Sequence, residues 1–296
     1  MKGKCGPNFM IIGAGKSGTT TLAHHLGQHP DIFVSDPKEP HYFTLNWDRG
    51  AEWYTGLFEG AGSFSARGEA SATYTLFPEF TDVPKRIRQY CEEGMRFIYI
   101  VRHPVERMLS HWAHDKMAGN IPVEQSIEDL LGSGTKYEYA SSYALQIEQY
   151  LQYFDQFSIK VVVFEKYIEN SQPVLRELFQ FLGVDAECAV EDLTAKNVSS
   201  QNRHVPGWIR EIEKLKEIPL IGQGVRGVSR ALRIKDLAYR VMGRKLDKER
   251  LSQDQYNALL EQFHPEIERL SKMLGCNLYT VWGEYKNMAS SPLPDK

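Results

Sequence analysis

The chain has 296 residues, enough for one large domain with a buried core or for two small ones. Its 35 basic and 38 acidic residues nearly balance, so the overall charge gives no reason to expect a nucleic-acid partner. Apolar residues make up 42% of the sequence, and no apolar run approaches the roughly 18 residues that a membrane span needs. We therefore expect a globular protein without a transmembrane segment.

The cysteines and the N-terminus bear on location. Cys5, Cys91, Cys188 and Cys276 are scattered and form no CxxC pair, which favours free thiols in a reducing compartment over a disulfide framework. The first strand is expected almost directly after Met1, which leaves no room for a signal peptide. These features predict a cytoplasmic location.

The first predicted elements surround a glycine-rich loop. Residues 9–12 form an apolar run typical of a buried parallel strand, a loop follows at 13–18, and a helix is predicted from Thr19 to Leu26. Glycine lets backbone N–H groups approach a ligand closely, and the positive end of the helix dipole favours an anion. Lys16 adds a full charge, so the segment predicts a phosphate or sulfate site; the alternative is a glycine-rich turn with a solvated lysine.

The loop does not match an NTPase P-loop. Gly15-Lys16-Ser17 could supply the second half of a Walker A motif, but that motif requires a glycine where Met10 stands. The loop is therefore too short for this class of nucleotide site.

A short second strand is predicted over Asp31–Val34, and a turn follows in which Pro37 and Pro40 flank Lys38 and Glu39. Prolines favour extended backbone on both sides, so they would fix the directions of Glu39 and His41. An aromatic-rich segment comes next, suited to lining a cleft or to packing beneath a loop: Tyr42, Phe43, Trp47, Trp53, Tyr54 and Phe58.

The remaining pattern alternates strands with helices. Further strands are expected at 67–71, 95–101 and 159–164, and helices at 84–90, from Pro104, and at 137–157, 173–182 and 252–274. Such alternation predicts a doubly wound parallel sheet covered by helices on both faces, which is an α/β fold. Arg102 comes directly after the strand at 95–101, at the carboxyl end where ligands bind in open α/β sheets.

The C-terminal part is locally basic. Residues 203–250 contain 13 Lys or Arg and 6 Asp or Glu, and mixed helical spacing of apolar residues. This predicts a basic helical segment that lines an anionic substrate or contacts a membrane surface peripherally; a solvated helix face is the alternative. We expect a single domain over residues 1–288 and a disordered tail at 289–296.

Three segments resemble one enzyme family. Gly13-Ala14-Gly15-Lys16-Ser17-Gly18-Thr19-Thr20 resembles the 5′-phosphosulfate loop of sulfotransferases that use 3′-phosphoadenosine 5′-phosphosulfate (PAPS). Residues 100–110, with an arginine, a proline and a helical serine, resemble their 3′-phosphate element. Lys38-Glu39-Pro40-His41-Tyr42-Phe43 is similar to the Lys-Glu-x-His-Phe-Phe segment of the heparan sulfate-type carbohydrate branch. The resemblance covers roughly residues 8–185 and implies a P-loop-like three-layer fold, as in a bacterial-like soluble member.

The resemblance implies binding roles. Lys16 and the N–H groups of Ser17, Gly18, Thr19 and Thr20 would hold the 5′-phosphosulfate. Arg102 and Ser110 would bind the 3′-phosphate, with Tyr143 and Arg203 as further nucleotide contacts; Tyr143 could instead belong to the core.

It also implies catalytic roles. Glu39 would act as general base, His41 would orient the acceptor or assist proton transfer, and Lys16 would stabilise charge on the leaving phosphate oxygen. Glu69 or Ser71 could touch the site or merely end a strand. No metal is implied.

Two departures bear on these roles. His103 stands where an aspartate is more usual, which affects a helix N-terminal hydrogen bond and leaves Arg102 intact. Ala70 stands where the heparan branch often has a lysine, which weakens the case for a sulfated polysaccharide acceptor.

The predicted function is transfer of a sulfuryl group from PAPS to a hydroxyl or amine of a carbohydrate, lipid or small-molecule acceptor, giving 3′,5′-ADP (PAP). A P-loop nucleotide kinase and a non-catalytic PAP- or glycan-binding module are the alternatives. The sequence specifies neither the acceptor nor the oligomeric state.

Overall fold

The structure, a computed structural model, describes residues 6–91, 93–122, 124–132, 134–194 and 251–289. The basic segment predicted at 203–250, with Arg203, lies outside these ranges, as do Cys5 and residues 290–296 of the predicted tail. Residue 289 ends a helix, α12 (Leu278–Ala289), that the sequence pattern did not predict.

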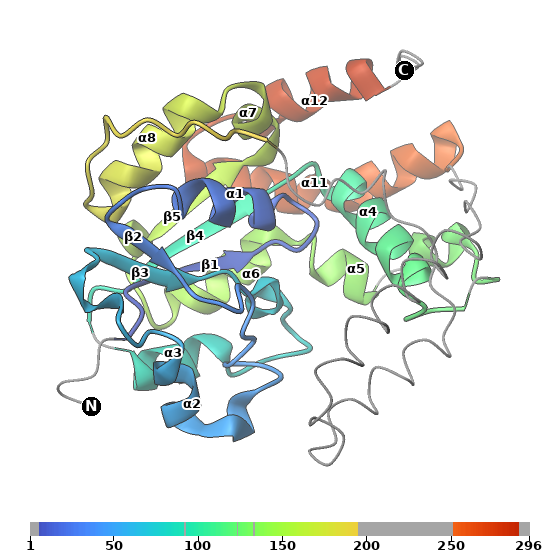
Figure 1. Ribbon diagram of the computed structural model, residues 1–296. Helices are drawn as coiled ribbons and strands as arrows, with labels where there is room; N and C mark the ends of the chain where they lie inside the picture. Colours follow the sequence, from blue (N-terminus) through green and yellow to red (C-terminus); the bar gives the residue numbers. More distant parts are fainter. Residues whose placement is uncertain (1–5, 92, 123, 133, 195–250, 290–296) are drawn as a thin grey trace, which may run out of the picture.

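Five parallel strands form one sheet in the order β2-β3-β1-β4-β5 (Figure 1). The strands are β1 (Phe9–Gly13), β2 (Ile32–Val34), β3 (Ala66–Glu69), β4 (Arg96–Val101) and β5 (Ile159–Val163). The central strand β1 pairs with β3 on one side and with β4 on the other. Because all the strands are parallel, their carboxyl ends meet at one edge of the sheet, which is where the loops predicted to bind ligand begin.

Helices cover both faces of the sheet. Alternate residues of a strand point to opposite faces, and here they fill two separate apolar clusters. Met10 and Ile12 of β1 pack in the cluster that holds α3 (Val83–Tyr90), α4 (Pro104–Met117), α6 (Tyr143–Leu151) and α11 (Gln253–Leu274). Phe9 and Ile11 pack in the cluster that holds α1 (Thr19–Leu26) and α8 (Ser171–Leu182) (Figure 1). The predicted three-layer α/β fold is confirmed.

Short helices occupy the connections. These are α2 (Gly50–Gly56), α5 (Lys136–Tyr139) and α7 (Phe164–Glu169), with 3₁₀ turns at Trp47–Arg49, Ala61–Ser63, Ala72–Thr75, Ile127–Leu131 and Gln156–Ser158. Within the described residues, no helix combines the length and the apolar character needed to cross a bilayer.

The prediction of a single helix at 137–157 is wrong. The chain forms α5 and α6 there, with a break between them, and α6 ends at Leu151. The serines at the break explain it, because the Ser141 hydroxyl donates to the Tyr137 carbonyl (2.9 Å) and the Ser142 hydroxyl to the Glu138 carbonyl (3.0 Å). Such side-chain bonds compete with a continuous helical ladder.

Several predicted boundaries also differ by one or two residues; the strand predicted at 67–71, for example, is β3 at Ala66–Glu69. The strand predicted to end at Phe164 ends at Val163, and Phe164 begins α7; the helix predicted from Pro173 begins at Ser171. In α11, by contrast, the expected cap is present: the Ser252 hydroxyl accepts from the Gln255 N–H, and the Gln255 side-chain oxygen accepts from the Ser252 N–H.

Candidate active site

The loop between β1 and α1 has a backbone suited to anions. Lys16 and Gly18 both have positive φ, +70° and +87°, on either side of Ser17. A side chain on Gly18 would also meet the Phe164 ring, since a Cβ there would lie 2.9 Å from it. Backbone of alternating hand turns successive N–H groups toward one point, and the first turn of α1 leaves further N–H groups without intrahelical partners. The loop and the helix start therefore have a backbone geometry suited to an anion.

Cations gather on the carbonyl side of this loop. Arg102 Nη1 donates to the Lys16 carbonyl, and Arg107 Nη1 donates to the Gly15 carbonyl, both at 3.4 Å. Burial lowers the pKa of the Lys16 ammonium, and the neighbouring Arg102 guanidinium lowers it further. Arg107 is fully buried, which also lowers its pKa. Positive charges held this close together favour an anionic ligand.

Two buried polar atoms near this loop lack hydrogen-bond partners that an anionic ligand could supply. Within the part of the chain that the structure describes, Ser17 Oγ and Arg102 Nε are buried and have no hydrogen-bond partner. Buried polar atoms are nearly always bonded, so each of these calls for an explanation. They belong to the two segments that the sequence assigns to the two phosphates of a nucleotide, and an anion at each place would satisfy them.

The chain around Arg102 is held from the core. The Tyr143 hydroxyl donates to the Arg102 carbonyl at 2.7 Å and accepts from its N–H at 3.3 Å, and Tyr143 is buried. Arg102 Nη2 lies 3.8 Å from Glu106. Ser110 is half-buried, two turns along α4. Tyr143 thus contacts the backbone of Arg102, which is a supporting position behind the loop.

The His103 side chain caps the start of α4. His103 Nδ1 accepts from the Glu106 N–H at 3.5 Å at the start of α4. The His103 N–H donates to Glu165 at 2.8 Å, and Trp282 Nε1 donates to the other oxygen of Glu165 at 2.9 Å. Burial raises the pKa of Glu165. Sequence reasoning missed Glu165, although its place just after a buried strand was a usable signal.

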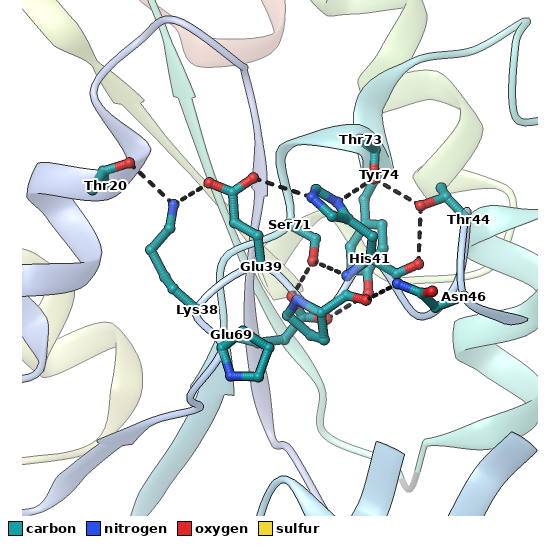
Figure 2. A network of polar contacts seen from close by, with 12 residues as sticks. Thr20, Lys38, Glu39, His41, Thr44, Asn46, Glu69, Ser71, Thr73 and Tyr74 are labelled. Atoms are coloured by element: carbon teal, nitrogen blue, oxygen red, sulfur yellow. Dashed lines mark hydrogen bonds and ion pairs between the residues drawn. The ribbon is translucent and has the colours of Figure 1, made fainter. Parts of the chain in front are cut away.

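Glu39 is connected to the anion loop by a chain of polar contacts (Figure 2). Lys38 Nζ donates to Thr20 Oγ1 at 3.2 Å and forms an ion pair with one oxygen of Glu39. The other oxygen of Glu39 lies 3.5 Å from His41 Nε2. The structure therefore brings Glu39 and His41 together and joins both to the first turn of α1. Lys38 is the joining residue, a role that sequence reasoning did not assign.

His41 is held in an unusual backbone conformation. Its φ is +49°, in the left-handed region that non-glycine residues rarely adopt. Its Nδ1 lies 2.9 Å from Thr73 Oγ1, and its N–H donates to Ser71 Oγ at 2.9 Å. Burial lowers the pKa of the imidazole and Lys38 lowers it further, whereas Glu39 raises it.

A second carboxyl lies beneath the Glu39 loop. Glu69 ends β3 and is fully buried, and it accepts hydrogen bonds from the hydroxyls of Tyr54 (3.0 Å), Ser71 (2.6 Å) and Tyr74 (2.5 Å). Burial raises its pKa to about 7, although the three hydroxyls act in the opposite direction. Glu69 is therefore a buried support of the site.

Comparison with known proteins identifies the family of the chain. Residues 6–216 match the family described as sulfotransferase domain. Membrane-associated sulfotransferase kil1 of Dictyostelium discoideum is 35% identical over 134 residues, which are 43% of this chain and 28% of that protein. Heparan sulfate glucosamine 3-O-sulfotransferase 6 of Mus musculus is 28% identical over 185 residues, 60% of this chain and 52% of that protein. The chain thus matches about half or less of the length of these relatives.

A solved structure shares the fold over almost the whole chain. The sulfotransferase from Alicyclobacillus acidocaldarius superposes with a TM-score of 0.66 and 22% identity, covering 94% of this chain and 99% of that one.

Proposed function

Because the chain belongs to the sulfotransferase family, we propose that it transfers a sulfuryl group from PAPS to a hydroxyl or amine of an acceptor, releasing 3′,5′-ADP. The observation that carries this proposal is the link Thr20–Lys38–Glu39–His41, which places a carboxylate beside an anion loop. Family membership favours sulfuryl transfer over the P-loop kinase and over a module that only binds.

The donor-binding residues follow from the two anion segments. PAPS supplies the sulfuryl group. Lys16 and the N–H groups from Ser17 to Thr20 bind its 5′-phosphosulfate, and Arg102 with Ser110 binds its 3′-phosphate. Tyr143 acts by holding the Arg102 backbone. Arg203 remains a proposed nucleotide contact that lies outside the described residues.

The chemistry assigned to this chain is proton removal and charge stabilisation. Glu39 accepts the proton of the acceptor hydroxyl while the acceptor oxygen forms its bond to sulfur, and His41 holds the second carboxylate oxygen. Lys16 stabilises the negative charge that develops on the phosphate oxygen as the S–O bond breaks. In this scheme Lys16 supplies the positive charge, and the rest of the rate enhancement comes from holding the acceptor and PAPS in line.

The acceptor is proposed from the relatives' chemistry. The name of one relative specifies a glucosamine hydroxyl in heparan sulfate, so we infer a carbohydrate or other polar acceptor here. Because Ala70 stands where the heparan branch often has a lysine, the site lacks one positive charge that would bind a polysulfated chain. A lipid acceptor, with peripheral membrane contact through 203–250, is the alternative, and a cytoplasmic location stays a prediction.

The experiment is sulfuryl transfer from labelled PAPS, with products detected by the mass gain of one SO₃ group in a panel of carbohydrate, lipid and metabolite acceptors. We expect Lys16→Ala to lose calorimetric binding of 3′,5′-ADP. We expect Glu39→Gln to keep that binding and to lower kcat by about a hundredfold or more, the usual contribution of a general base. Glu59→Gln, an exposed carboxylate outside the site, is the matched control. Full activity of Glu39→Gln would contradict the assignment of the base.

A further inference from the structure

Ser71 connects the buried carboxyl of Glu69 to the loop that carries Glu39. Its hydroxyl donates to Glu69 Oε2 at 2.6 Å and accepts from the His41 N–H at 2.9 Å (Figure 2). Both Ser71 and Glu69 are fully buried, so water does not compete for these bonds. The Ser71 hydroxyl thus links the buried carboxyl of Glu69 to the backbone of His41 through two hydrogen bonds.

The backbone at His41 needs such support. A left-handed conformation costs a non-glycine residue about 1–2 kcal/mol, comparable to one or two net hydrogen bonds. The chain on either side is also held: Ala70 N–H donates to the Lys38 carbonyl at 2.9 Å, and Asn46 Nδ2 donates to the Pro40 carbonyl at 2.8 Å. The segment after β3 therefore determines where the loop from Lys38 to His41 lies.

The hydrogen bonds at Glu69 explain the direction of the Ser71 hydroxyl. Three hydroxyls donate to this carboxyl, and Ser71 is one of them. With its proton directed at Glu69, the Ser71 oxygen presents its lone pairs to the His41 N–H. A group at this place that does not accept from the Ser71 hydroxyl would remove this preference and let the hydroxyl rotate.

We propose that Glu69, acting through the Ser71 hydroxyl, is a positioning residue: it fixes the left-handed backbone at His41 and so keeps the imidazole facing Glu39. The catalytic consequence rests on the proposed function, whereas the geometric part does not. Positioning of this kind affects the chemical step and leaves the donor loop at Lys16–Thr20 untouched.

Two variants separate positioning from general loss of stability. Ser71→Ala and Tyr54→Phe each remove one hydroxyl that donates to Glu69, but only Ser71→Ala breaks the connection to His41. Both variants are compared with wild type in thermal unfolding, in calorimetric binding of 3′,5′-ADP, in kcat, and in the NMR titration of the His41 ring, assigned with His41→Gln.

For Ser71→Ala we expect 3′,5′-ADP affinity to stay within about twofold and kcat to fall about tenfold, the effect of one lost hydrogen bond in the chemical step. The pKa of His41 should rise toward its ordinary value, because the ring is released from the burial that lowers it. Tyr54→Phe should change neither kcat nor the His41 titration. If Ser71→Ala does not fold, Glu69→Gln takes its place with the same expectations.

An unchanged kcat and His41 titration in Ser71→Ala would overturn the proposal, and so would an equal loss in Tyr54→Phe. If wild-type protein transfers no sulfuryl group to any acceptor, the proposed function fails, and the His41 titration still decides whether Glu69 and Ser71 fix the loop.

Discussion

Burial of Glu69 makes the free energy of unfolding depend on pH, and Glu69→Gln should remove this dependence. Its pKa is about 7 in the folded protein, against an ordinary value of 4.5. A pKa raised by folding means that the folded state binds the proton more tightly, so this stabilisation is complete below pH 4.5 and is lost as pH rises through 7. At 1.36 kcal/mol per pKa unit, the loss between pH 5 and pH 8 is about 2.5 kcal/mol.

The measurement is urea unfolding of wild type and Glu69→Gln by circular dichroism at pH 5, 6, 7 and 8. The free energy of unfolding of wild type minus that of the variant should fall by about 2.5 kcal/mol across this range, while contributions from other titrating groups cancel. Glu52→Gln, an exposed carboxylate on α2, should give a flat difference. Parallel curves for wild type and Glu69→Gln would refute the argument that burial raises this pKa.

Two further substitutions test the anion loop and the support of Arg102. Gly18→Ala should lower the unfolding temperature and weaken 3′,5′-ADP binding by about tenfold or more, because a Cβ there would lie 2.9 Å from the Phe164 ring. The control is Gly60→Ala, where φ is also positive (+79°) but a Cβ would have no neighbour within 4 Å. This control should lose only the about 1–2 kcal/mol of stability that a left-handed backbone costs a non-glycine residue. Equal effects of the two would contradict the steric argument. Tyr143→Phe should weaken 3′,5′-ADP binding about three- to tenfold by loosening Arg102, whereas Tyr150→Phe, which removes another buried hydroxyl bond, should lower stability alone. Undiminished binding by Tyr143→Phe would show that its hydroxyl does not position Arg102.

The sheet, and the positions of the glycine-rich loop and of Arg102 at its edge, were predictable because their signals are local. An apolar strand, a glycine-rich turn and a helix start lie within residues 9–26, and Arg102 follows its strand directly. Periodicity also predicted both helical layers. It failed at 137–157, where two serine hydroxyls interrupt a continuous apolar pattern, since such competition depends on where each hydroxyl points.

The supports of the site were not predictable in the same way. Thr20 meets Lys38, and Ser71 meets His41, only after β1, β2 and β3 have assembled. Arg107 is a further example: it occupies an ordinary position in a helix, yet it is fully buried and donates to the Gly15 carbonyl. Charged residues are rarely buried, so composition and spacing alone would place it at the surface.

The strand order has an evolutionary consequence. Because β1 lies between β3 and β4, the anion loop meets Glu39 from one side and Arg102 from the other. The connection from β2 to β3, residues 35–65, carries Glu39 and its aromatic surroundings. The segment at 102–110, with the proposed 3′-phosphate contacts, follows β4 and is a separate part of the chain. On the proposed roles, insertions or replacements within 35–65 can change which molecule reaches the base while the nucleotide contacts are inherited intact. The fold thus allows a lineage to acquire new acceptors by altering one connection of the chain.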